Sequence, residues 1–239
     1  MLAVFKRDFT AYFTSAIGYI YIGAYILILN LMFYLDNALG SSSSLAGLFS
    51  FMLMVMMFIT PILTMRVFSE EFKQKTDQLL CTAPIRMSSI VLGKFFSSLA
   101  VFACLLLLTV IWPFTISIFG ENNMAEVIGN YIGIFCIGAA YIAMGVFISS
   151  LTENQVIAAV GSLCLFIALF ILEFVAMMFY SSGILPLFFM RFFLFISIYG
   201  RYREITRGLL SLDTIIFFIS VCAVFLFLTI GALHRRRQG

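Results

Sequence analysis

The chain has 239 residues, of which 63% are hydrophobic and 10% are charged, and its mean hydropathy is +1.13. Soluble domains carry about 25% charged residues, so the composition excludes an ordinary soluble protein and indicates a polytopic membrane protein. A net charge of +3, dispersed beside the apolar runs, is too small to indicate nucleic-acid binding.

Residues 1–15 are predicted to form an interfacial elbow helix that lies in the plane of the membrane surface. Apolar side chains fall on one helical face and polar side chains on the other. The apolar face holds Leu2, Phe5, Phe9, Tyr12 and Phe13, and the polar face holds Lys6, Arg7, Asp8 and Thr10. The apolar run that follows is too long for a signal-peptide core, so we interpret it as an uncleaved first span.

Six apolar runs are each long enough to cross a bilayer as a helix, which takes about 20 residues. The predicted spans cover residues 16–35, 46–65, 95–118, 127–148, 156–180 and 212–233. Pro113 is expected to kink the third span. Thr152 and Gln155 have the spacing of a capping box, which predicts the start of the fifth. The predicted fold class is an all-α polytopic membrane protein with six transmembrane helices in a single transmembrane domain.

Residues 184–200, within the segment 184–205, are apolar enough to suggest a seventh span, but this stretch has only 17 residues and Arg191 lies near its middle. An arginine at the bilayer centre costs roughly 2.5–3.5 kcal/mol on insertion scales. We therefore expect an outer re-entrant helical hairpin before the last span.

Orientation follows from the distribution of Lys and Arg, which favours the cytoplasmic side. With the N terminus inside, ten basic residues face the cytoplasm: Lys6, Arg7, Arg66, Lys73, Lys75, Arg86, Lys94, Arg235, Arg236 and Arg237. Four face outward: Arg191, Arg201, Arg203 and Arg207. Both termini and the polar segment 66–90 are therefore predicted to be cytoplasmic.

Motifs for chemistry are absent from the sequence. No phosphate-binding loop, nucleophile elbow or metal-ligand spacing occurs, and the five cysteines are spread singly. Glu173 is embedded in the fifth span, where a carboxylate is a functional candidate by default. The alternative is a hydrogen-bonded group that reaches interfacial water or an arginine of the hairpin. Gly129 and Gly133 form a G-x-x-x-G pair that permits close helix packing, within the chain or between subunits.

The segment 66–90 contains an apolar stripe at helical spacing, formed by Phe68, Phe72, Thr76, Leu79, Leu80 and Ala83. Glu71 and Lys75 have the spacing of a favourable helical ion pair, and Pro84 ends the predicted helix. The segment is either a solvated linker on the lipid headgroups or a helix that fits a partner's groove.

The pattern resembles the coupling-helix region of type-2 ABC exporter permeases. The resemblance is carried by Ser69-Glu70-Glu71, Thr76, Leu79-Leu80, Ala83-Pro84 and Gly93-Lys94-Phe95, with Lys75 in place of the family's usual glycine. The loop 149–155 and the segment 202–218, with Arg207-Gly208-Leu209-Leu210 and Asp213, also agree with that family. Among its subgroups, the gliding-motility type permeases are the most similar.

The resemblance implies a permease subunit in the bacterial cytoplasmic membrane, paired with a second permease subunit, identical or not, and docked on two copies of an ABC ATPase. An accessory extracytoplasmic membrane protein is a further candidate partner. ATP and Mg would bind the ATPase, so this chain would need no cofactor and would not itself be an enzyme. The implied ATPase-coupling residues are Phe68, Glu70, Glu71, Phe72, Thr76, Leu79, Leu80, Thr152 and Glu153. The implied residues of the translocation path or gate are Glu173, Arg191 and Arg207.

Two other functions remain compatible with the residues. A stand-alone secondary carrier or channel would normally show inverted repeats and paired intramembrane charges, and no convincing repeat is present. A membrane scaffold of a surface machine would need the docking segment but no translocation path. The many Phe and Met residues suit a lipid, amphiphile or hydrophobic peptide as substrate, although the same residues fill any lipid-facing surface.

Overall fold

The computed structural model describes residues 1–35, 46–75, 86–119, 124–181, 197, 200–201 and 212–238. Its helices in chain order are α1 (Leu2–Thr14), α2 (Ala16–Phe33), α3 (Ala46–Thr64), α4 (Ser69–Lys73), α6 (Met87–Thr109), α7 (Ile111–Phe119), α8 (Met124–Leu151), α9 (Gln155–Ser181) and α12 (Leu212–Gln238). Thr76, Leu79, Leu80, Arg191 and Arg207 lie outside the described residues, as does nearly all of the predicted hairpin at 184–205.

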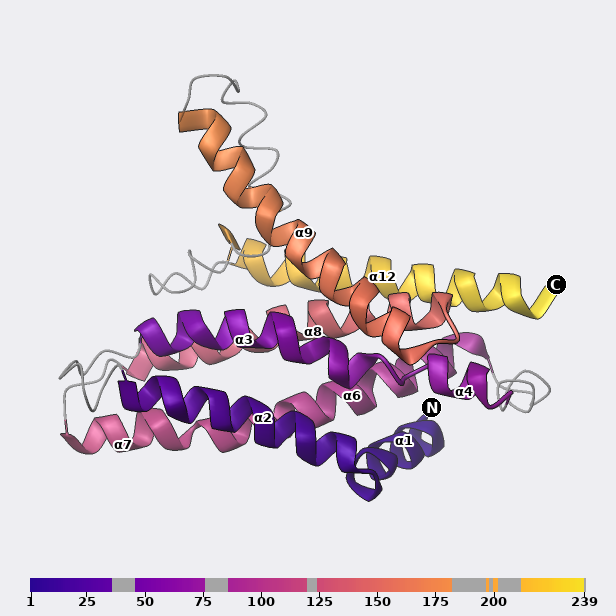
Figure 1. Cartoon of the computed structure of the whole chain (residues 1–239), viewed down its shortest axis with the longest axis horizontal. Helices are drawn as coiled ribbons and strands as arrows, with labels where there is room; N and C mark the ends of the chain where they lie inside the picture. The colour runs from indigo at the N-terminus through magenta and orange to yellow at the C-terminus, as the bar shows by residue number, and fades with distance from the viewer. Residues whose placement is uncertain are drawn as a thin grey trace.

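Six helices within this described part are long and apolar enough to cross a membrane, which confirms the all-α fold class and the predicted number of spans. The two chain termini, α1 and α4 lie at one end of the helix bundle (Figure 1). We call this end the terminal end. It is the end that the Lys and Arg distribution predicts to be cytoplasmic.

Helix α8 is the centre of the bundle and packs against α3, α6, α9 and α12. Two glycines bring it close to its neighbours. A Cβ atom at Gly138 would overlap the Phe102 ring of α6, and a Cβ at Gly145 would overlap the Thr64 side chain of α3. These two small residues of the fourth span therefore serve contacts within the chain, and Gly129 and Gly133 are also buried within it.

Helix α9 is packed in its first half and diverges from the bundle in its second (Figure 1). Near its middle the Phe166 ring stacks on Tyr141 of α8, with centroids 4.4 Å apart. Further along, Phe174 and Met178 are 67% and 60% exposed. The second half thus presents exposed apolar surface.

Helix α6 ends at Thr109 and α7 begins at Ile111, and Val110 between them keeps a right-handed helical conformation, as expected of a kink in the third span. We call this interruption the α6–α7 break. Pro113 has no N–H to donate to the carbonyl of Thr109, four residues earlier. The hydroxyl of Tyr131, on α8, donates to that carbonyl at 2.9 Å. A side chain of a neighbouring helix therefore replaces the backbone hydrogen bond that the proline removes.

Candidate functional site

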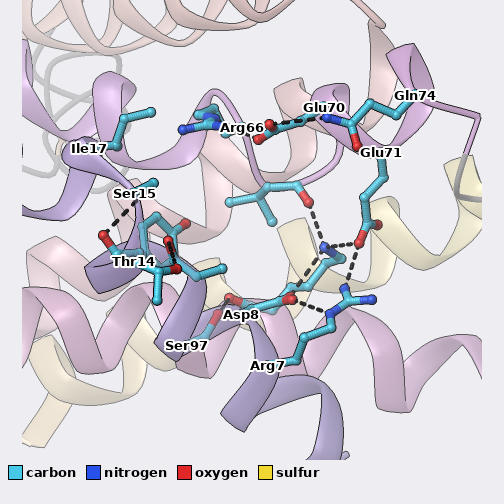
Figure 2. Close-up of a pocket in the computed structure, with 14 residues that line it drawn as sticks. Arg7, Asp8, Thr14, Ser15, Ile17, Arg66, Glu70, Glu71, Gln74 and Ser97 are labelled. Carbon is cyan, nitrogen blue, oxygen red and sulfur yellow. Dashed lines mark hydrogen bonds and ion pairs between the residues drawn. The ribbon is translucent and has the colours of Figure 1, made fainter.

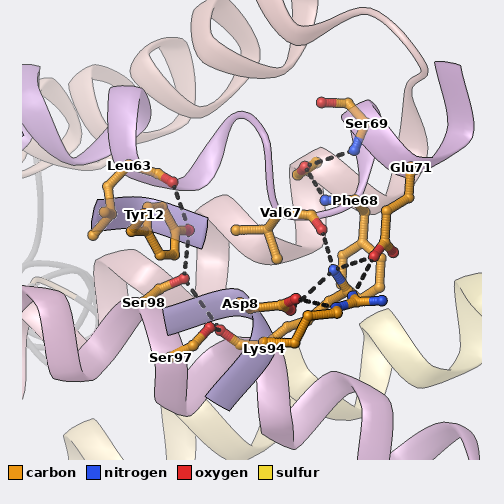
Figure 3. A network of polar contacts seen from close by, with 12 residues as sticks. Asp8, Tyr12, Leu63, Val67, Phe68, Ser69, Glu71, Lys94, Ser97 and Ser98 are labelled. Atoms are coloured by element: carbon orange, nitrogen blue, oxygen red, sulfur yellow. Dashed lines mark hydrogen bonds and ion pairs between the residues drawn. The ribbon is translucent and has the colours of Figure 1, made fainter. Parts of the chain in front are cut away.

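Four residues at the terminal end, 65–68, interrupt the helical chain between α3 and α4. We call them the α3–α4 break. A helix end leaves backbone N–H and C=O groups without helical partners, and burying them unpaired is costly. Side chains of three other helices supply partners here, as Figure 3 shows.

Tyr12 of α1 and Lys94 of α6 supply donors to carbonyls beside and within the break. The Tyr12 hydroxyl donates to the Leu63 carbonyl at 3.0 Å, and the Lys94 ammonium donates to the Val67 carbonyl at 2.7 Å. Burial raises the pKa of Tyr12 above its ordinary value, so the hydroxyl keeps the proton that it donates.

Ser149 of α8 satisfies three backbone groups with one hydroxyl. The hydroxyl donates to the Met65 carbonyl at 3.2 Å and accepts the N–H groups of Phe68 and Ser69 at 3.1 and 3.3 Å. The first turn of α4 is thereby fixed to the end of the central helix. Ser149 was predicted only as part of a loop, whereas the structure places it inside the last turn of α8, fully buried.

Lys94 is the buried cation of the site, with its side chain only 4% exposed. Its Nζ lies 2.9 Å from a carboxylate oxygen of Glu71 and 3.2 Å from one of Asp8, besides the Val67 carbonyl. An ammonium group has three protons, and three oxygens surround it. Removing the ammonium group from water costs roughly several kcal/mol, and the two nearby carboxylates offset this cost.

Arg7 of α1 bridges the same two carboxylates from the outer side. Its Nε lies 2.8 Å from Asp8 and its Nη2 lies 2.6 Å from Glu71, so cations and anions alternate around a closed ring of four side chains. Partial burial acts to lower the pKa of Arg7, but the Asp8 and Glu71 carboxylates outweigh it and raise that pKa above its ordinary value. We call Arg7, Asp8, Glu71 and Lys94 the charged ring.

A cavity of about 510 Å³ opens beside the charged ring, between α1, α4 and α6 (Figure 2). Across it, the Arg66 guanidinium donates to both carboxylate oxygens of Glu70 at 2.5 Å. Glu70 and Glu71 therefore point to different partners, although they are adjacent in the chain. Glu71 ties α4 to α1 and α6, while Glu70 stays within the α3–α4 segment.

Asp8 departs from its prediction. The amphipathic pattern placed it on the polar face of the first helix with Lys6 and Thr10, but its side chain is only 14% exposed. The placement of Asp8 was wrong because Val4 and Tyr12, four residues before and after it on the same side of α1, are buried, so Asp8 lies on the inward face. The ammonium group of Lys94 neutralises the inward-facing carboxylate of Asp8. Leu2, predicted on the apolar face, is 81% exposed.

The apolar stripe of the 66–90 segment faces the chain's own interior in its first part. Phe68 and Phe72 are 2% and 5% exposed, and their rings stack with centroids 6.0 Å apart. The prediction of one continuous helix over 68–83 was wrong, because α4 ends at Lys73. Lys75 then adopts a φ of 56°, a left-handed conformation that favours glycine. Lys75, at the position where the resemblance leads us to expect glycine, therefore has a backbone conformation that glycine adopts easily.

The second predicted coupling element is the turn 152–154 between α8 and α9. The capping-box prediction was wrong in its register: α9 begins at Gln155, and Asn154 is the residue whose side chain accepts the Val156 N–H, at 2.9 Å. Thr152 accepts the Asn154 N–H at 3.2 Å and so shapes the turn. The Glu153 side chain is 67% exposed.

Sequence reasoning missed the residues that hold the site together. Lys94 was counted as a cytoplasmic charge and as part of the Gly93-Lys94-Phe95 motif, yet α6 begins at Met87 and carries it inside. A lysine with apolar residues and glycine at 90–93 before it and two phenylalanines after it was the available signal for a buried, paired cation. Glu173 lies in α9, well apart in the chain from this site.

The family model described as ABC-2 family transporter protein matches residues 35–237. No curated protein matches the chain.

Proposed function

The chain belongs to the ABC-2 family of transporter proteins and so is a multi-pass membrane component of an ABC transporter. We propose that it is the permease subunit of an exporter in the bacterial cytoplasmic membrane, with both termini inside. Two copies of a separate ABC ATPase bind Mg and ATP and drive it, and a second permease subunit completes the path. Membership of the gliding-motility subgroup stays a prediction.

The observation that carries the proposal is the attachment of α4. This five-residue helix is joined to α1 and α6 through the charged ring and to α8 through Ser149. A force that an ATPase applies to α4 from the cytoplasmic side would therefore be transmitted to α1, α6 and α8 together. Without such an attachment, a short helix on the membrane surface would move alone.

The structure refines which coupling residues could touch an ATPase. Phe68 and Phe72 are buried in this chain, so we assign them the role of anchoring α4 rather than of entering a partner's groove. Among the described residues 66–75 and 152–154, the exposed ones are Lys73, Gln74, Lys75, Glu153 and Asn154. These polar side chains are the proposed contact surface. Thr76, Leu79 and Leu80 keep their predicted coupling role.

An apolar cavity supports an amphiphile or lipid as substrate. It has a volume of about 340 Å³ and lies among α2, α3, α8 and α9. Its lining includes Met32, Phe51, Met57, Tyr141 and Phe170. Glu173 follows Phe170 by one helical turn on the diverging helix α9, which keeps it a candidate for the translocation path. Arg191 and Arg207 stay proposed gate residues.

A stand-alone carrier is less well supported. Carriers place coupling charges near the middle of the membrane, whereas Lys94 lies at the terminal end and is neutralised by Asp8 and Glu71. Its geometry suits attachment of α4 better than ion movement.

Co-purification tests the proposal. When an affinity-tagged chain is extracted from native membranes, an ATPase should co-purify with it at one copy per permease subunit. This ATPase should hydrolyse Mg-ATP. Reversing the exposed charges, with Lys73→Glu and Lys75→Glu together, should release that ATPase. The matched control, Lys6→Glu, changes a charge on α1 and should not. If no ATPase co-purifies with the parent chain, the proposal is contradicted and a stand-alone carrier is favoured.

A further inference from the structure

A row of four side chains crosses α4 from one span to another. Nζ of Lys94, on α6, lies 5.2 Å from the centroid of the Phe68 ring. Phe68 stacks on Phe72, and Cζ of Arg236, on α12, lies 4.2 Å from the Phe72 centroid. Cations are attracted to aromatic faces. Two cations, from the third and the last span, therefore bracket the two rings that anchor α4.

Arg236 also contacts the turn 152–154 and the residue before it. Its Nη1 lies 3.5 Å from the Glu153 carboxylate, and its Nη2 donates to the Leu151 carbonyl at 3.4 Å. Either contact alone is weak, because the side chain is 36% exposed and water screens the charge. The planar guanidinium can, however, stack on a ring while its edge donates hydrogen bonds. One side chain thus joins α12, α4 and the end of α8.

We propose that Arg236 is a positioning residue that makes the end of α12 follow α4 and the turn 152–154. The inference rests on the proposed function and adds the last span to the elements that the ATPase moves. The two predicted coupling segments then act as one unit, because the same guanidinium contacts both. Arg235 carries the same charge in the same helical turn, and it provides the matched control.

The resting arrangement can be tested without an ATPase. The chain is placed in lipid nanodiscs with its five cysteines replaced, and spin labels are attached at the exposed positions Lys73 and Arg237. Pulsed electron paramagnetic resonance should give a narrow distance distribution for the parent and a broadened one for Arg236→Ala. Arg235→Ala should leave the width unchanged, and Arg236→Lys, which keeps the cation on the ring, should restore part of it. An unchanged width in Arg236→Ala would overturn the inference.

Coupled motion is tested in the purified complex, nucleotide-free and trapped with ATP and vanadate, after the labelled protein has been shown to retain its ATPase. A second label pair, Lys73 with the exposed Phe174 in the diverging half of α9, reports displacement of α4 and the helices attached to it. In the parent, trapping should change the Lys73–Phe174 distance and leave Lys73–Arg237 constant. In Arg236→Ala, both distances should change.

The two hypotheses fail in different ways. A constant Lys73–Arg237 distance in Arg236→Ala, with α4 displaced, overturns the role of Arg236 and leaves the proposed function standing. If the Lys73–Phe174 distance of the parent does not change on trapping with nucleotide, the proposed function itself is contradicted.

Discussion

Two breaks interrupt the long helices in the described part of the chain, and they are stabilised very differently. At the α6–α7 break, the Tyr131 hydroxyl on the Thr109 carbonyl replaces the bond that Pro113 removes. At the α3–α4 break, Tyr12, Lys94 and Ser149 supply partners from three helices, and the charged ring adds ion pairs. The single hydrogen bond at the α6–α7 break only satisfies the carbonyl that the proline leaves without its helical partner. The arrangement at the α3–α4 break fixes a short helix to its surroundings, as force transmission through that helix requires.

The largest expected effect is at Lys94. Lys94→Met leaves the Glu71 and Asp8 carboxylates without their buried cation, and removing one partner of a buried ion pair costs about 3–5 kcal/mol. The free energy of unfolding, measured by titration with SDS in mixed micelles, should fall by that amount. Lys73→Met removes an exposed lysine from α4 and should change it little. Equal effects of the two substitutions would contradict the buried role of Lys94.

Ser149 should have the next largest effect. Ser149→Ala leaves the N–H groups of Phe68 and Ser69 without their partner, while the Met65 carbonyl still accepts the Ser69 hydroxyl. Unsatisfied buried groups cost about 1–3 kcal/mol. The neighbouring Ser150 is equally buried, but its hydroxyl donates to Phe147 in its own helix. Ser150→Ala should therefore cost clearly less in the same titration. A larger effect at Ser150 would show that the break does not depend on Ser149.

The α6–α7 break should be more tolerant. Tyr131→Phe removes the single hydroxyl that donates to the Thr109 carbonyl, so the expected loss is about 1 kcal/mol, the typical contribution of one hydrogen bond. A loss as large as that of Lys94→Met would erase the contrast between the two breaks.

The smallest effect has the opposite sign. Lys75 holds a left-handed conformation that is easier for glycine, so Lys75→Gly should stabilise the protein by about 0.5–1 kcal/mol. Gln74→Gly, one residue earlier and right-handed, should destabilise it. Thermal unfolding in detergent distinguishes the two. Destabilisation by Lys75→Gly would mean that the side chain contributes more than its backbone strain costs.

The number of spans could be predicted because it depends on the length and polarity of continuous segments. The stripe of Phe68 and Phe72 was also visible, since it depends on local spacing. Which surface that stripe meets was not visible, because an apolar stripe fits a partner's groove and its own bundle equally well. The structure shows it packed on neighbouring helices of the same chain.

The charged ring could not be found from local patterns because its members come from three distant segments. Asp8 on an amphipathic helix is normally a solvated residue, and only the approach of Lys94, 86 positions later, gives it a buried partner. The position of Ser149 was missed for a related reason. Helix ends are uncertain by one or two residues, and the hydroxyl acts because α8 extends past it.

The two close approaches of α8 restrict how the protein can change shape. With no room for a methyl group between Gly138 and Phe102 or between Gly145 and Thr64, α8 cannot slide or roll against α6 or α3 without first separating from them. These three helices should therefore travel as one rigid block. Any rearrangement within the protomer would then fall to the more loosely seated α2 and to the diverging half of α9.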